Sequence, residues 1–156
     1  MLDPNQFLDE HGEELQRGII KEELIPEIFE FILECATQHI KYMLHKLSML
    51  YYYLAKYKYQ PDDQTTTLVG SIRRSSRELS LILNSSKSLR NKITTENQMT
   101  VYIDAIKSIS NEMIDSIPES IPEEFDIDKI VDSTYIESYL NKYASAMEVK
   151  FILNIK

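Results

Sequence analysis

The stretch Tyr51–Pro61 reads Tyr-Tyr-Tyr-Leu-Ala-Lys-Tyr-Lys-Tyr-Gln-Pro, and it decides the fold. It ends an amphipathic pattern in which apolar residues recur every three or four positions from Ile28 to Tyr57, over about eight helical turns. Because a residue before proline is pushed out of the helical region, the pattern predicts one helix over 27–59. At 1.5 Å per residue such a helix is about 50 Å long.

Two adjacent rows of residues form the apolar side of this helix. The first row is Ile28, Ile32, Cys35, His39, Met43, Leu47, Leu50, Leu54 and Tyr57. The second row is Phe29, Ala36, Ile40, Leu44 and Tyr51. A stripe of this width predicts that more than one neighbouring element buries it.

Capping residues on both sides predict further helices. Asp3-Pro4 is typical of a helix start, and Gly18 of the same helix's end. Thr65-Thr66-Thr67 predicts the cap of a third helix, which breaks at 84–86, and Thr94 or Thr95 the cap of a fourth. The expected inner positions are Leu68, Ile72, Ser76, Leu79, Ile82 and Leu83 in the third helix, and Met99, Tyr102, Ile103, Ile106, Ile109 and Met113 in the fourth.

The C-terminal third has shorter patterns. Pro118 and Pro122 predict an extended linker, followed by short helices near 126–132 and 134–148. In residues 149–156, apolar and polar residues alternate weakly. This segment is therefore either a short strand or a packed tail. With three glycines in 156 residues, too few for the turns of a sandwich or barrel, the sequence predicts an all-α fold. We expect an up-and-down bundle of about four main helices with short C-terminal helices, in a single domain over 1–156.

Composition excludes several classes of protein. A hydrophobic content of 43% argues against disorder, and no apolar run approaches the roughly 20 residues of a membrane span. The start Met1-Leu2-Asp3-Pro4 lacks the features of a signal peptide, and the one cysteine, Cys35, excludes an intrachain disulfide. We therefore expect a soluble, cytoplasmic protein.

Charge is segregated along the chain. Residues 1–38 carry ten acidic and two basic side chains, residues 39–92 three acidic and ten basic, and residues 93–156 twelve acidic and five basic. One interpretation is self-complementarity, in which acidic segments fold beside the basic centre. The other is a basic patch for an anionic partner, and both stay open.

Three short motifs resemble those of the small bacterial proteins known as domain of unknown function 29. Residues 54–61 resemble the family's helix end of lysine, an aromatic residue and Tyr-Gln-Pro. Ser71-Ile72-Arg73, Leu83 and 86–90 resemble its Thr-Ile, Leu-Leu and Ser-Pro-Ser-Leu-Arg positions, and 117–135 its proline-rich segment. The resemblance covers about 20–138, which leaves 139–156 as a C-terminal extension.

The chain departs from this family pattern at three places. The basic pair after the proline is Asp63-Gln64, the tryptophan is Leu68, and Lys87 replaces the proline of Ser-Pro-Ser. The resemblance implies an all-helical fold. It implies no established activity, so no functional residue can be carried over from it.

Candidate chemical sites are incomplete. Cys35 and His39 share a helix face, but no further Cys-x-x-Cys or His-x-x-x-His completes a set of about four metal ligands. The acidic run 122–128 lacks the glycine and the final glutamate of a calcium loop, and no glycine-rich phosphate loop occurs. We therefore expect no metal, no cofactor and no catalytic constellation.

The best candidate surface combines aromatic and basic residues. Its members are Tyr52, Tyr53, Lys56, Lys58, Tyr59, Arg73, Arg74, Arg77 and Arg90. Tyrosine at a helix boundary serves both core packing and partner contact, while aromatics among lysines also suit single-stranded nucleic acid. The leading hypothesis is a non-enzymatic protein–protein interaction module, either a homo-oligomer or the acidic half of a two-protein system. The alternatives are a nucleic-acid-associated protein and an uncharacterised enzyme.

Overall fold

The computed structural model of the protein describes residues 2–109 and 117–155, and all regular secondary structure in these ranges is helical. This confirms the all-α prediction. The chain divides into two compact units, Met1–Tyr42 and Met43–Lys156. The prediction of a single domain over residues 1–156 stays a prediction. No helix in the described part of the chain has the length and apolar character needed to cross a membrane.

The N-terminal unit begins with α1, Pro4–Gln16, at the predicted cap. The Asp3 carboxylate accepts hydrogen bonds from the backbone N–H groups of Asn5 and Gln6, and Pro4 occupies the first helical position. Gly18 ends the helix with a φ of 78°, in the left-handed region that glycine adopts without strain. Its N–H donates to the Leu15 carbonyl and that of Ile19 to the Glu14 carbonyl, which satisfies two otherwise free carbonyls.

After the 3₁₀ turn η1, Glu22–Leu24, the helix α2 runs over Ile25–Tyr59 as one element of 35 residues. This confirms the predicted long helix and its end before Pro61. The following 3₁₀ turn η2, Pro61–Asp63, reverses the chain. The N-terminal part of α2 belongs to the first unit, and its C-terminal part, from Met43, belongs to the second.

The second unit holds the remaining helices. Thr65 and Thr94 cap α3 and α5 as predicted, because their hydroxyls accept from the N–H groups of Leu68 and Asn97. The helices are α3 (Thr66–Ser85), α4 (Lys87–Lys92), α5 (Thr95–Lys107), η4 (Glu123–Phe125), α6 (Ile127–Ile130), α7 (Ser133–Tyr143) and α8 (Met147–Ile152). Of the two alternatives for the last segment the strand is wrong, since α8 is a helix and Val149 is buried.

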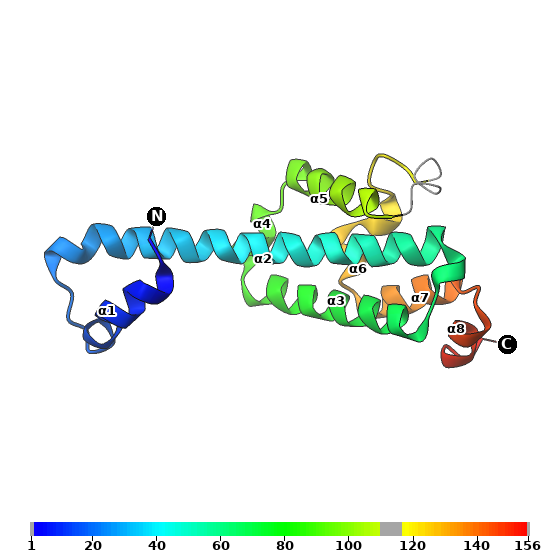
Figure 1. Cartoon of the computed structure of the whole chain (residues 1–156), viewed down its shortest axis with the longest axis horizontal. Helices are drawn as coiled ribbons and strands as arrows, with labels where there is room; N and C mark the ends of the chain where they lie inside the picture. Colours follow the sequence, from blue (N-terminus) through cyan, green and yellow to red (C-terminus); the bar gives the residue numbers. More distant parts are fainter. Residues whose placement is uncertain (1, 110–116, 156) are drawn as a thin grey trace. The chain divides into compact units, whose positions relative to one another are not determined.

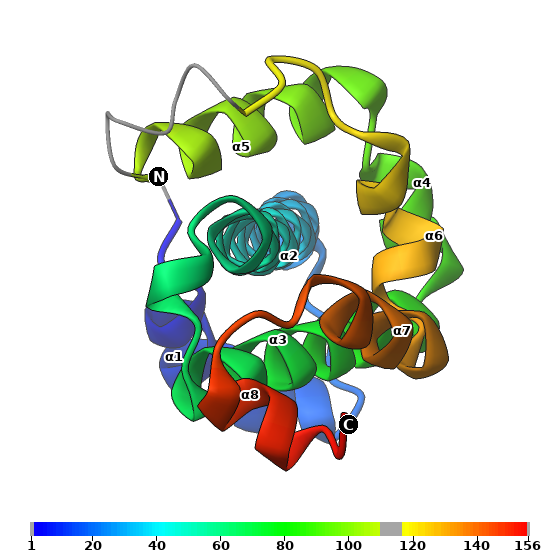
Figure 2. The ribbon, with the colours of Figure 1, turned by 90° about the vertical axis from the view of Figure 1, so that its right-hand side faces the viewer.

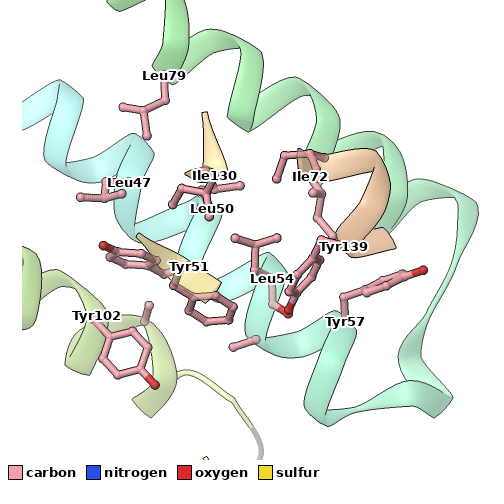
Figure 3. Packing of buried hydrophobic residues seen from close by; sticks show 14 of the residues in the cluster. Leu47, Leu50, Tyr51, Leu54, Tyr57, Ile72, Leu79, Tyr102, Ile130 and Tyr139 are labelled. Carbon is pink, nitrogen blue, oxygen red and sulfur yellow. The ribbon is translucent and has the colours of Figure 1, made fainter. Parts of the chain in front are cut away.

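Within this second unit the C-terminal half of α2 lies between α5 on one side and α3 on the opposite side (Figures 1 and 2). The chain direction alternates through α2, α3 and α5, as an up-and-down arrangement requires (Figure 1). The buried residues in the C-terminal half of α2 form one core with side chains of α3, α5, α6 and α7 (Figure 3). Tyr51 meets Tyr102 edge-on at 5.6 Å between ring centroids and stacks on Phe125 at 6.1 Å.

Most predicted inner positions of the third and fourth helices are buried. The exceptions are Ile82, Met99 and Ile103, which are half-buried at the edge of the core. Met113 lies outside the described residues.

The prediction that neighbours bury the whole stripe of α2 is wrong for its N-terminal half. From Met43 onward both rows are buried or half-buried, but Phe29 is 64% exposed, Ile32 is 55% exposed and His39 is exposed. In the N-terminal unit, α1 offers one buried residue, Phe7, which stacks on Phe31 at 4.9 Å. Phe31 belongs to neither predicted row, but Ile28 and Cys35 of the first row flank it on the helix and are half-buried.

Candidate interaction surface

Lys58 is held inside a cluster at the end of α2 rather than presented to a partner. Its ammonium donates to Glu124 at 2.9 Å and lies 4.9 Å from the centre of the Tyr143 ring. The Tyr143 hydroxyl donates to the same carboxylate. Burial by itself lowers the pKa of Lys58, but the hydrogen bonds with Glu124 and Tyr143 outweigh it and raise that pKa. The lysine is therefore a half-buried cation with a structural role.

Two of the candidate arginines are also paired within the chain. The Arg73 guanidinium donates two hydrogen bonds, of 2.7 and 2.9 Å, to the Glu137 carboxylate on α7. Arg90 donates two longer ones, of 3.3 and 3.4 Å, to Asp128. With Lys58 and Glu124, these pairs join the basic segment 39–92 to the acidic segment 93–156, which supports the self-complementary interpretation of the charge pattern.

The three candidate tyrosines are half-buried and pack against the core. The rings of Tyr52 and Tyr53 meet at 5.6 Å, and the Lys56 ammonium lies 5.8 Å from the centre of the Tyr52 ring. Tyr59 lies beside Lys58, whose ammonium is 5.1 Å from its ring centre. These side chains therefore keep one polar edge at the surface, as tyrosine at a boundary does.

Arg74 and Arg77 differ from the other candidate cations. Both are exposed on α3, and neither forms an ion pair with any residue that the structure describes. Together with Glu78, which pairs with Lys46 at 2.8 Å, they make one charged stretch of the helix. Part of the predicted surface therefore holds the fold together. Of the other basic residues, Arg74 and Arg77 are exposed and Lys56 is half-buried.

Gln64 is a structural residue that the sequence analysis missed. It is buried, and its amide nitrogen donates to the carbonyls of Tyr57 (2.8 Å) and Tyr143 (2.7 Å). Its oxygen accepts from the N–H groups of Ser145 (2.8 Å) and Ala146 (3.2 Å). A single polar residue in a turn gives no periodic signal, so nothing in the sequence pointed to this role.

Four of the large apolar residues that are exposed in the N-terminal unit share one side of α2. We call Ile25, Phe29, Ile32 and Leu33 the open face; each is between 41% and 67% exposed. Their spacing of four, three and one places them within one stripe about 100° wide. Monomeric proteins seldom leave such a contiguous stripe uncovered, and where they do it commonly marks an interaction site.

Acidic residues surround the open face in the sequence of the same unit. Residues 1–42 contain ten acidic and three basic side chains. Glu30 directly follows Phe29 and Glu34 directly follows Leu33, so carboxylates accompany the apolar residues turn by turn. The unit therefore combines exposed apolar area with negative charge.

Cys35 and His39, which were considered as metal ligands and not expected to form a site, differ in their exposure to solvent. Cys35 is a half-buried free thiol, and His39 is exposed. Within residues 2–109 and 117–155, no group of three or more His, Cys, Asp or Glu side chains is arranged to hold a metal ion. In the acidic run, Glu124 and Asp128 instead pair with Lys58 and Arg90.

The family model described as "Domain of unknown function DUF29" matches residues 2–136. The chain belongs to the DUF29 family. Neither a curated protein nor a solved structure matches it. The DUF29 match begins earlier than the resemblance over 20–138 predicted, so it includes α1 and the whole open face.

In this DUF29 chain, residues of two motifs that carried the resemblance form hydrogen bonds with later parts of the chain. Within 54–61, Tyr57 and Lys58 bind the C-terminal part of the chain, and within 86–90, Arg90 does the same. These contacts give the motif residues a structural role.

Proposed function

We propose that this DUF29 chain is a non-enzymatic protein–protein interaction module and the acidic half of a two-protein system. The open face of α2 is the observation that carries the proposal, because it leaves four large apolar side chains in contact with water. Covering a large apolar side chain completely contributes about 1.5–3 kcal/mol, so a partner that covers this stripe gains a substantial driving force.

The partner that fits is an amphipathic helix with apolar residues on one side and lysine or arginine beside them. A helix laid on an exposed apolar stripe is a common mode of recognition. The excess of carboxylates in residues 1–42 favours a basic partner and speeds its association. A second copy that docked by its own open face would bring like charges together, which disfavours that form of homo-oligomer.

The test is capture with wild-type protein and with two serine variants. Phe29→Ser removes the centre of the open face, and Phe151→Ser is its matched control, because Phe151 is an 82%-exposed phenylalanine of the second unit. The proposal expects one captured protein with a basic amphipathic segment, retained by wild type and Phe151→Ser but lost with Phe29→Ser. A strict monomer in sedimentation that retains no such protein contradicts it.

Association with nucleic acid is the second candidate, favoured by Arg74 and Arg77 on α3, which are exposed and have no ion-pair partner within residues 2–109 and 117–155. Internal pairing of Lys58, Arg73 and Arg90 reduces the charge available to phosphates. Titration of single-stranded DNA at about 50 mM salt tests this candidate, since phosphate contacts dominate there. Absence of binding under that condition removes this candidate.

For either function we propose a cytoplasmic location, which suits a chain with a single cysteine.

A further inference from the structure

A hollow of about 400 Å³ lies between α3 and α7 in the second unit. The two helices pack side by side there (Figure 2). Leu81, Val131 and Ile136 supply its apolar lining, and Leu81 is 65% exposed. Sites for small molecules commonly have volumes of about 300–1,000 Å³, apolar walls and a few polar groups.

The polar groups that line the hollow are mainly hydrogen-bond donors. Arg77 lines it without an ion-pair partner among the described residues, and the hydroxyls of Ser80 and Ser133 also line it. Ser76 is a lining residue whose hydroxyl is already used, because it donates to the Ile130 carbonyl at 2.6 Å. An arginine beside an apolar wall is suited to a planar anion that it can bind through two parallel hydrogen bonds.

One carboxylate, that of Glu137, also lines the hollow. Both of its oxygens accept hydrogen bonds from Arg73, so it does not neutralise Arg77. Arg73 also lines the hollow, so this ion pair adds no net charge to the site and leaves Arg77 as the cation available to a ligand. The site thus combines one cation without an ion-pair partner among the described residues, two hydroxyls, an apolar wall and the Arg73–Glu137 ion pair.

We propose that this hollow binds a small molecule with one carboxylate group and a compact apolar body. The carboxylate pairs with the Arg77 guanidinium, and the apolar body covers Leu81, Val131 and Ile136. The site is separate from the open face of α2. It therefore adds a ligand to the proposed interaction module and does not depend on that function.

Phenylacetate is a suitable probe because it joins one carboxylate to one aromatic ring. For a molecule of this size we expect a dissociation constant on the order of 1 mM. The measurement is the shift of backbone amide NMR signals during titration. The expected shifts lie in α3 and α7. Shifts confined to other elements, or no shift up to about 10 mM probe, overturn the proposal.

Two variants on α3 separate the role of Arg77 from general charge. Arg77→Gln should weaken phenylacetate binding at least about tenfold. Arg74→Gln removes the same charge three positions away from Arg77, outside the lining, and should leave binding unchanged. Because both arginines are exposed, both variants should fold like wild type, which the unshifted remainder of each spectrum reports. Equal binding by Arg77→Gln and wild type contradicts the proposal.

Two further probes test the ligand chemistry. Phenylacetamide keeps the ring and removes the charge, so it should bind at least about tenfold more weakly than phenylacetate. Phenyl phosphate carries a second negative charge and should also bind more weakly, because Arg73 is engaged by Glu137 and Arg77 balances one charge. Equal binding of the amide overturns the anion assignment, and tighter binding of the phosphate overturns the carboxylate assignment.

Discussion

The hydroxyl of Tyr57 donates a hydrogen bond of 2.6 Å to the backbone carbonyl of Leu140, a residue 83 positions later in the chain. In the reverse sense, the Tyr139 hydroxyl on α7 donates to the Leu54 carbonyl on α2 at 2.7 Å. The end of α2 and the middle of α7 therefore exchange buried hydrogen bonds. The aromatic stretch that ends the long helix connects two distant parts of the second unit, and Figure 3 shows Tyr57 and Tyr139 at this junction.

Replacing Tyr57 by phenylalanine should destabilise the protein by about 1–2 kcal/mol, because the Leu140 carbonyl loses its buried donor. The measurement is the midpoint and slope of urea unfolding. Tyr51→Phe is the matched control on the same helix. The Tyr51 hydroxyl is buried without a hydrogen-bond partner among the described residues, so its removal should leave stability unchanged or raise it. Equal losses in the two variants would contradict a specific role for the Tyr57 hydroxyl.

Replacing Gln64 by leucine should cost about 3 kcal/mol or more, since two carbonyls and two N–H groups lose their partner together. Gln60→Leu is the control. Gln60 lies four residues earlier, and its side chain makes no hydrogen bond with any residue that the structure describes. Urea unfolding again measures both. A Gln64→Leu protein as stable as Gln60→Leu would show that the four contacts do not hold the turn.

Acid should weaken the fold partly through Glu124. Burial by itself raises the pKa of this carboxyl, but hydrogen bonds from Tyr143 and Lys58 outweigh it and hold the pKa below its ordinary value. The unfolded chain then takes up the proton first as pH falls. The stabilisation is therefore complete above the ordinary carboxyl pKa of about 4.3 and is lost as pH falls through the lower folded pKa.

The variant Glu124→Gln should unfold with a smaller dependence on pH below about pH 5 than wild type. Some dependence should remain, because Lys46 and Thr66 hold the pKa values of Glu78 and Glu148 below normal by hydrogen bonding. Glu119→Gln removes an exposed carboxylate and serves as the control for net charge. An acid profile of Glu124→Gln that overlays that of wild type would refute the assignment.

Buried tyrosines should lose their phenolic protons at a higher pH than exposed tyrosines do. Burial raises the pKa of Tyr57 and of Tyr102 to about 12, and it also raises the pKa values of Tyr51 and Tyr139 well above the ordinary value. These phenols stay neutral in the folded state, so their contribution to stability is present below the ordinary pKa of about 10 and is lost as pH rises towards the folded values. Tyrosinate absorbance should therefore rise in two phases. A single phase near pH 10 for all ten tyrosines in the native protein would contradict the burial described here.

Local signals were sufficient to predict much of the fold. Asp3, Thr65 and Thr94 cap helices through hydrogen bonds to N–H groups two or three residues away, and Pro61 ends α2 through its immediate neighbour. Each of these effects involves residues that are adjacent in sequence, so the residue types alone reveal it.

Burial and pairing depend on distant residues and were predicted less well. Ile32 and Met43 belong to the same apolar row of α2, yet one is 55% exposed and the other fully buried. The periodicity of α2 cannot show which of its turns acquires a neighbour. Pairing of acidic segments with the basic centre was one of two interpretations that the charge pattern left open, and the pattern did not select Glu124, Glu137 and Asp128 as the partners.

The central proposal is that the open face receives a basic amphipathic helix, and direct titration tests it. A labelled synthetic helix of leucine and lysine is added to wild type, Phe29→Ser and Phe151→Ser, and fluorescence anisotropy reports binding. We expect binding to wild type and Phe151→Ser that weakens as salt rises, and an affinity lower by about tenfold or more with Phe29→Ser. Equal affinity for all three proteins, or tighter binding of a leucine–glutamate helix, would contradict it.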